Sequence, residues 1–222
     1  MTFPSRHITI GVMVEKSFFA DRLPSVVCLL AGPVLFTIAD LFWVGDAEYS
    51  LVAGTLLVLG SVAWIVGFAG IAAVIRPHAP RIAGWGMVLA TYGAVCGGAA
   101  FGLQGVFNEM YGVSHSQALD SLSQHPVVAY VIFWAGGPAF PLTLVLLAIY
   151  LLASRRAPVW VGSLLAVGAL LFPVARIPRI ELVAIAVDVL MLIPTVYLAA
   201  VIARGEGLRV PRDGAADGRE RS

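Results

Sequence analysis

Six long apolar runs constrain this chain more than any other feature of its sequence. An α-helix rises about 1.5 Å per residue and the hydrocarbon core of a bilayer is about 30 Å thick, so about 20 apolar residues suffice to cross it. Short breaks rich in proline, glycine, arginine or acidic residues separate the runs. We therefore predict an all-α, polytopic integral membrane protein, folded as a bundle of six transmembrane helices. The predicted spans are residues 23–44, 51–75, 82–107, 127–152, 159–177 and 182–202.

The composition excludes several other classes of protein. Of the 222 residues, 59% are hydrophobic and only 12% are charged, which is too apolar for a water-soluble core. The 14 basic and 13 acidic residues nearly cancel, so no basic field is available to bind nucleic acid. Cys28 and Cys96 both lie in apolar runs, where they are expected to be packing residues and not a disulfide or a metal site.

The basic residues predict the orientation of the bundle. Twelve of the fourteen precede the first span, follow an even-numbered span or lie in the tail, and Arg176 and Arg179 are the exceptions. The positive-inside rule then places both termini in the cytoplasm of a multi-pass cell-membrane protein. We expect a cytoplasmic N-terminal segment at 1–22, a transmembrane domain at 23–203 and a disordered cytoplasmic tail at 204–222, which has too little apolar surface to fold.

Acidic residues gather on the outer side of this topology, together with two histidines. We interpret Asp46, Glu48 and Asp120 as solvating charges of outer loops. The outward-facing polar cluster as a whole is the main clue to function. Its members are Asp40, Asp46, Glu48, Glu109, Asp120, Glu181, Asp188, His115 and His125.

Two acids inside the apolar runs are the candidate catalytic residues. Asp188 lies between valines in the sixth span, with no basic residue within one helical turn. Buried away from cations, its carboxyl is expected to be protonated at neutral pH and able to donate that proton. Asp40, near the outer end of the first span, is the second candidate. Arg176 ends a span that runs in the same direction, so the two lie at similar depth, where an unpaired charge is costly and a partner is expected.

Other residues of the outer half are candidate substrate-binding groups. Arg176 and Arg179 would bind an anionic head group or pair with Asp40, Glu181 or Asp188. Gln104 and Asn108 are four residues apart, on one helical face, and Glu109 follows them; the alternative role of the two amides is an interhelical hydrogen bond. The aromatic candidates for a lipid-soluble substrate are Trp43, Trp64, Trp85, Tyr92, Phe101, Tyr130 and Trp134.

Glycine and proline patterns predict how two spans pack. The Gly93-xxx-Gly97 and Gly98-xxx-Gly102 pairs permit close backbone approach, so the third span is expected to be central. In the fourth span Pro138 and Pro141 each remove an amide donor and predict a kink, and Pro194 predicts another in the sixth. Kinks in both spans would open the middle of the bundle.

Several chemistries have no signature in the chain. All four histidines lie in loops or tails, which disfavours a bis-histidine haem in the bilayer. No zinc motif, phosphate-binding glycine loop or paired-aspartate magnesium motif occurs, so we expect neither a cofactor nor a metal.

Three hypotheses for function follow. In the first, Asp188 or Asp40 protonates a lipid-soluble, isoprenoid substrate in an aromatic-lined pocket. By its size, helix count and lone acids the chain is loosely similar to small integral-membrane terpene cyclases, although no motif is shared. In the second, the same residues form a transporter or lipid-binding protein with a polar pocket on its outer side; six spans make a small transporter, which would call for a homodimer. In the third, the polar cluster is an interface of a membrane-complex subunit.

Overall fold

The computed structural model describes residues 21–44, 48–176 and 180–205. Six stretches of this part of the chain are helical, long and apolar enough to cross a membrane, which confirms the predicted helical bundle. The predicted tail lies outside the described residues, apart from Arg204 and Gly205, as does nearly all of the predicted N-terminal segment. The elements are α2 (Leu23–Asp40), β1 (Trp43–Val44), β2 (Glu48–Tyr49), α3 (Leu51–Ile75), α4 (Pro80–Ala94), the π-helix η1 (Val95–Ala99), α5 (Ala100–Tyr111), α6 (His115–Ser123), α7 (Pro126–Val128), the π-helix η2 (Ala129–Ala135), α8 (Gly136–Ser154), α9 (Val159–Arg176) and α10 (Glu181–Arg204).

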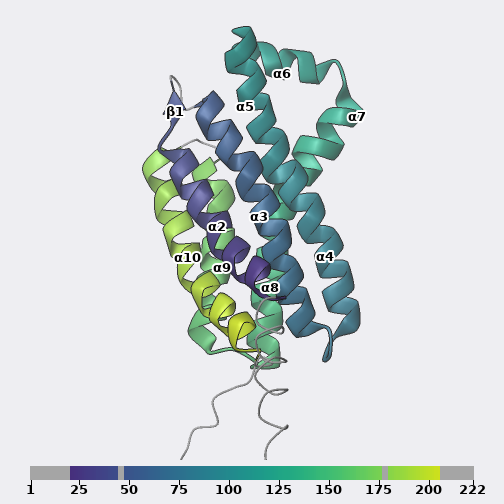
Figure 1. Cartoon of the computed structure of the whole chain (residues 1–222). Helices are drawn as coiled ribbons and strands as arrows, with labels where there is room; N and C mark the ends of the chain where they lie inside the picture. Colours follow the sequence, from purple (N-terminus) through teal and green to yellow (C-terminus); the bar gives the residue numbers. More distant parts are fainter. Residues whose placement is uncertain (1–20, 45–47, 177–179, 206–222) are drawn as a thin grey trace, which may run out of the picture.

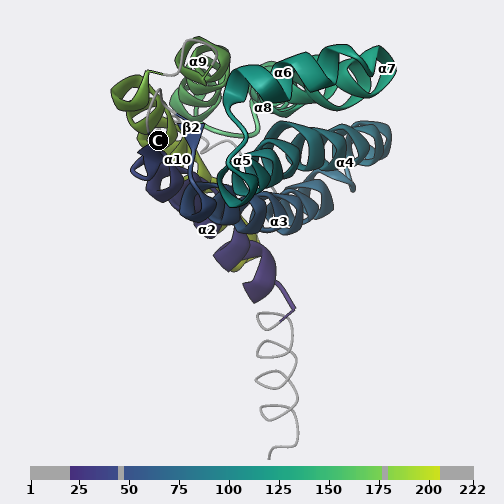
Figure 2. The same ribbon diagram turned by 90° about the horizontal axis from the view of Figure 1, so that it is seen from above.

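The helices form a closed ring in chain order. Each membrane-long helix packs on the next one, and α10 completes the ring by packing on α2 (Figure 1). The start of α2 and the end of α10 lie at one end of the bundle, which we call the terminal end. The opposite end, called the hairpin end, carries β1, β2 and α6. Figure 2 looks down on the hairpin end, where α6 lies across the bundle and not along it.

The first helix is shorter than predicted. It ends at Asp40, and Trp43 and Val44, which we had assigned to the span, form the strand β1. This strand pairs antiparallel with β2, where Trp43 lies opposite Tyr49 and Val44 opposite Glu48. The short hairpin brings Glu48 and Tyr49 back over the end of the bundle.

Glycines allow the third span to approach its neighbours closely. A Cβ atom added to Gly93 would lie 2.5 Å from the backbone nitrogen of Phe140 in α8. At Gly102 it would lie 2.6 Å from the carbonyl oxygen of Gly54 in α3. The predicted close packing of this span is confirmed, but the span is not central, because it is one member of the ring between α3 and α8.

Replacement of Gly93 by alanine is therefore expected to destabilise the protein by about 1–3 kcal/mol, because α4 and α8 must move apart. Gly84 on the same helix is the matched control, since a Cβ there meets nothing within 4 Å. Gly84→Ala should be neutral or stabilise by about 0.5–1 kcal/mol, through the better helix propensity of alanine. Thermal unfolding of the two variants in one detergent measures the difference. Equal stabilities would show that α4 and α8 are not in backbone contact.

The fourth span is irregular ahead of the prolines at which a kink was predicted, because the π-helix η2 precedes α8, and α8 begins at Gly136. Helix α8 runs through Pro141 and α10 runs through Pro194 without a break. The hydroxyl of Tyr92 donates a hydrogen bond to the carbonyl of Val131 within η2, so a side chain of the third span supports this segment. A second π-helix, η1, lies in the third span and contacts η2.

A cluster of buried aromatic rings fills the middle of the bundle, where the prolines predicted an opening. Phe140 of α8 is fully buried at its centre, with its ring centroid 5.3–6.5 Å from those of the four other members. These rings belong to α2, α3 and α9. The members of this aromatic cluster are Phe36, Trp64, Phe68, Phe140 and Phe172.

Candidate functional site

Three ionisable side chains meet at the hairpin end of the bundle. Asp40 is the last residue of α2, Arg176 is the last residue of α9, and Asp188 lies in the second turn of α10. One guanidinium nitrogen of Arg176, Nη2, lies 3.0 Å from Asp40 Oδ2 and 2.8 Å from Asp188 Oδ2. Nη1 donates a further hydrogen bond to Asp188 Oδ1 at 3.2 Å. We call these three residues the ionic triad. Of the alternatives open for Arg176, pairing with Asp40 and with Asp188 is observed.

The triad lies directly on the aromatic cluster. Both carboxyl side chains are inaccessible to solvent, and the arginine side chain is 10% exposed. The guanidinium carbon lies 4.1 Å from the ring centroid of Phe172 and 5.8 Å from that of Phe36, within the range of cation–π attraction. The guanidinium is thus engaged by two carboxylates and two rings, an arrangement that leaves it poorly disposed to bind an anionic head group.

The environment predicted for Asp188 is wrong in one respect. The carboxyl is buried, but it is not remote from cations, since Arg176 from the preceding helix binds it. The two residues are 12 positions apart and lie on different helices, so a search within one helical turn does not find the pair. Two carboxyls share one guanidinium, which gives the triad a formal charge of −1 when both are ionised.

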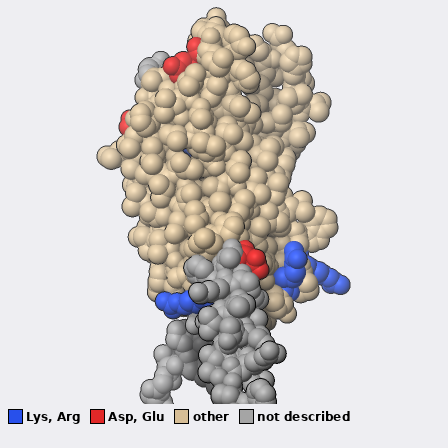
Figure 3. Space-filling view, viewed as in Figure 1, with Lys and Arg blue, Asp and Glu red and all other residues tan. Residues whose placement is uncertain are grey.

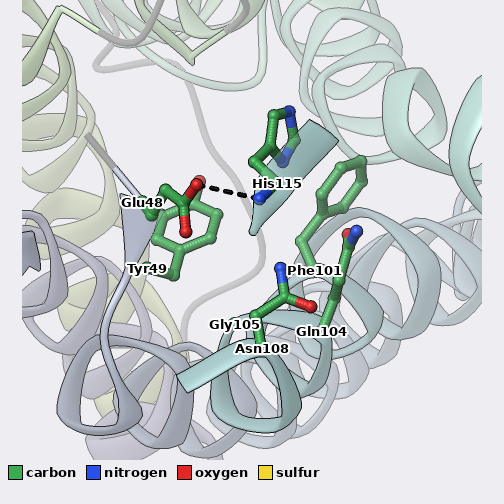
Figure 4. Close-up of a pocket in the computed structure, with 7 residues that line it drawn as sticks. All are labelled: Glu48, Tyr49, Phe101, Gln104, Gly105, Asn108 and His115. Atoms are coloured by element: carbon green, nitrogen blue, oxygen red, sulfur yellow. Dashed lines mark hydrogen bonds between the residues drawn. The ribbon is translucent and has the colours of Figure 1, made fainter. Parts of the chain in front are cut away.

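A polar pocket lies beside the triad at the hairpin end. It is a shallow, partly open recess between β2, α5 and the start of α6, with an enclosed volume of about 10 Å³ (Figure 4). Tyr49 belongs to its wall, and the strand that carries it pairs with β1, which follows the end of α2 at Asp40. We call this the polar pocket. Its lining residues are Glu48, Tyr49, Phe101, Gln104, Gly105, Asn108 and His115.

The two amides predicted as a pair come together in this pocket. Gln104 and Asn108 project from one face of α5, across from Glu48 and Tyr49 (Figure 4). Neither side-chain amide has a hydrogen-bond partner among the described residues, so the alternative of an interhelical hydrogen bond is not observed there. Gly105 lies between them, and a Cβ at that position would be 2.6 Å from the Cβ of Tyr49. The glycine thus lets the hairpin close down on α5.

The two glutamates of this region have different roles. Glu48 Oε1 accepts a hydrogen bond of 3.0 Å from the backbone N–H of His115, which joins the hairpin to α6. Glu109 lies outside the pocket wall and accepts a hydrogen bond from the backbone N–H of Leu51, one of the orphan donors at the start of α3. Glu109 therefore has a structural task, and its predicted role in substrate binding remains untested.

The remaining predicted binding residues lie away from the pocket wall. Trp43 packs edge-on against Tyr49, with ring centroids 5.6 Å apart, and so supports the pocket from behind. Trp134 is 72% exposed on the surface that faces lipid, as is Trp85 at 75%. Arg179 lies outside the described residues.

Sequence reasoning missed the contribution of the hairpin and of α6 to this site. Glu48 was interpreted as a solvating charge, and Tyr49 was not singled out. The only available signal for His115 was its membership of the outer polar cluster. All three reach the pocket through the pairing of β1 with β2 and the capping of α6 by Ser114, which fix the paths of two connections.

Comparison with protein-family models, with curated proteins and with solved structures finds no match for this chain. Among the described residues, no three His, Cys, Asp or Glu side chains are grouped so that they could hold a metal ion.

Proposed function

We propose that this protein is a membrane-embedded binding protein that accepts the polar head of an amphiphilic small molecule in the polar pocket. The observation that carries the proposal is the convergence of two unpartnered amides, Gln104 and Asn108, with a carboxylate and two aromatic rings. A few convergent polar groups in a concave site are typical of ligand pockets. The enclosed space is only about 10 Å³, room for about one water-sized group, so the site is a polar recess that a head group would cover and not a cavity that would hold a whole ligand.

The surface of α5 supports an amphiphilic ligand. Leu103, Phe107 and Met110 are 45–58% exposed and follow one another at helical spacing beside Gln104 and Asn108. A head group in the polar pocket would leave its alkyl chain free to lie along this apolar stripe in the bilayer. The same helix would then contact both parts of the ligand.

We further propose that the polar pocket opens on the outer side of the membrane, with both termini in the cytoplasm. Apart from Arg176, every described arginine lies at the terminal end, and Figure 3 shows basic side chains gathered there. The positive-inside rule favours this end as the cytoplasmic one. These arginines are Arg22, Arg76, Arg81, Arg155, Arg156 and Arg204.

Mass spectrometry of lipids extracted from the protein, purified in a neutral detergent, tests the binding function. We expect a co-purifying amphiphile whose amount falls at least tenfold in the Gln104→Leu/Asn108→Leu double variant, because both replacements remove hydrogen-bonding groups from the pocket. Gln124→Leu is the control, since this exposed amide at the end of α6 does not line the pocket. An amphiphile retained equally by all three proteins would mean that it binds elsewhere.

Acid-catalysed conversion of a lipid-soluble substrate such as an isoprenoid is a second candidate, and one observation favours it. In the ionic triad two carboxyls face one guanidinium, so one of them has no basic partner of its own. A carboxyl of this kind inside a membrane is a candidate proton donor. Catalysis would require a path to Asp40 or Asp188, both of which are fully buried against the aromatic cluster.

A further inference from the structure

We infer that the polar pocket selects a head group with a positive charge, an ammonium or quaternary ammonium group on an alkyl chain. This inference rests on the proposed function, because it names the ligand class of the same pocket. It is carried by the charge of the pocket wall, by the charge around it and by the aromatic rings that face its interior.

The wall of the pocket is negative. Among the described lining residues Glu48 is the one acidic side chain, and none is an arginine or a lysine. Glu48 Oε1 accepts the hydrogen bond from the His115 backbone, and the carboxylate keeps its full charge in doing so. A carboxylate or phosphate head would therefore meet a like charge there, whereas an ammonium head would be attracted.

The charged side chains around the pocket are also mostly negative. Arg176 lies at the same end of the bundle, but both carboxylates of the ionic triad bind it, so it adds no net positive charge. Among the described residues, six acidic side chains lie at the hairpin end, against Arg176 as the single arginine or lysine. The six are Asp40, Glu48, Glu109, Asp120, Glu181 and Asp188.

The remaining groups of the wall suit an ammonium ion. Tyr49 and Phe101 present aromatic rings on two sides of the pocket, and the faces of such rings attract organic cations, quaternary ammonium groups above all. Gln104 and Asn108 offer amide oxygens that can accept hydrogen bonds from a primary ammonium. A carboxylate, two rings and two amide oxygens together form a site for a small organic cation.

Binding of three probes with the same twelve-carbon chain tests the inference: dodecyltrimethylammonium, dodecanoate and the neutral dodecanol. Dissociation constants are measured for the whole protein in nanodiscs of zwitterionic lipid, with the Gln104→Leu/Asn108→Leu variant defining binding outside the pocket. We expect dodecyltrimethylammonium to bind at least tenfold more tightly than dodecanoate. Because the attraction is electrostatic and partly exposed, this preference should weaken as salt is raised.

Glu48→Gln is the decisive variant, since glutamine keeps an oxygen for the His115 N–H and removes only the charge. We expect it to weaken binding of dodecyltrimethylammonium at least fivefold and to leave that of dodecanol unchanged. Asp21→Asn, which removes an exposed charge at the terminal end of the bundle, should change neither. The probe series on the wild-type protein tests the preference even if Glu48→Gln does not fold.

The possible failures are distinguishable. Dodecanoate binding as tightly as the ammonium probe, with both dependent on Gln104 and Asn108, would overturn the inference on charge and leave the proposed binding function standing. An ammonium preference that survives Glu48→Gln would also overturn it. If no probe shows binding that depends on Gln104 and Asn108, the proposed function itself fails, and the inference fails with it.

Discussion

Arg176→Gln is expected to destabilise the protein by about 3–5 kcal/mol, the cost of removing one partner from a buried ion pair. The variant leaves Asp40 and Asp188, neither of which is accessible to solvent, facing each other without a cation. It also removes the attraction of the guanidinium for the ring of Phe172, 4.1 Å away. Thermal unfolding in detergent measures the loss. Arg155→Gln, at an exposed position of the terminal end, is the control and should change stability by less than about 0.5 kcal/mol.

Replacement of either aspartate is expected to destabilise the protein less than replacement of Arg176, because the ionic triad holds two carboxyls and one guanidinium. Asp40→Asn or Asp188→Asn leaves one carboxylate for one guanidinium and preserves a hydrogen-bonding oxygen, so each should cost only about 1 kcal/mol. Combining Asp40→Asn and Asp188→Asn with Arg176→Gln removes every charge and should recover part of the stability lost in Arg176→Gln alone. If Asp188→Asn were as damaging as Arg176→Gln, the balance of charge would not be what holds the triad together.

The same variants separate a structural triad from an acid catalyst. Asparagine cannot donate a carboxylic proton, so an enzyme that uses Asp188 would lose turnover of its substrate in a variant that remains folded. Unchanged turnover in a folded Asp188→Asn protein would exclude this carboxyl as the proton donor. Asp40 would then be the remaining candidate of the acid-catalysis hypothesis.

The six helices could be predicted because the bilayer dictates their length. A partner for Arg176 could be expected because an unpaired charge inside a membrane is costly, but which of Asp40, Glu181 and Asp188 it binds could not be predicted. The end of the first helix could not be predicted either. Trp43 and Val44 continue the apolar run, and their departure into β1 depends on pairing with Glu48 and Tyr49. The partner of Asp188 was missed because it comes from another helix. Tertiary contacts determine where α2 ends and which residue binds Asp188, and such contacts leave no periodic pattern in the sequence.

The aromatic residues were hard to place for a different reason. Trp64 and Trp134 both lie in membrane-spanning helices, yet Trp64 is 1% exposed and Trp134 is 72% exposed. In a soluble helix the polar face identifies the side that points to solvent, whereas lipid is as apolar as the interior of the bundle. Hydropathy therefore cannot tell a ring that packs in the core from one that faces lipid. For this reason the aromatic cluster, with four phenylalanines, was not foreseen.

Phe140→Ala is expected to destabilise the protein by about 2–3 kcal/mol. The ring of Phe140 is fully buried and contacts the four other members of the aromatic cluster. In a membrane the gain from transferring the ring out of water is small, and the lost packing remains. Removal of roughly 100 Å³ at about 24 cal/mol per Å³ of cavity corresponds to about 2.4 kcal/mol.

Phe42→Ala is the control, since this side chain is 44% exposed beyond the end of α2 and its loss opens no cavity. Unfolding of both variants in the same detergent gives the difference. The comparison also bears on function, because Phe140 contacts Phe36 and Phe172, the two rings on which the guanidinium of the ionic triad lies. A Phe140→Ala protein as stable as Phe42→Ala would mean that the middle of the bundle is loosely packed, as a substrate cavity requires, and would favour acid catalysis. The expected loss would instead mean that the centre is a packed core, which would count against acid catalysis on an isoprenoid held there.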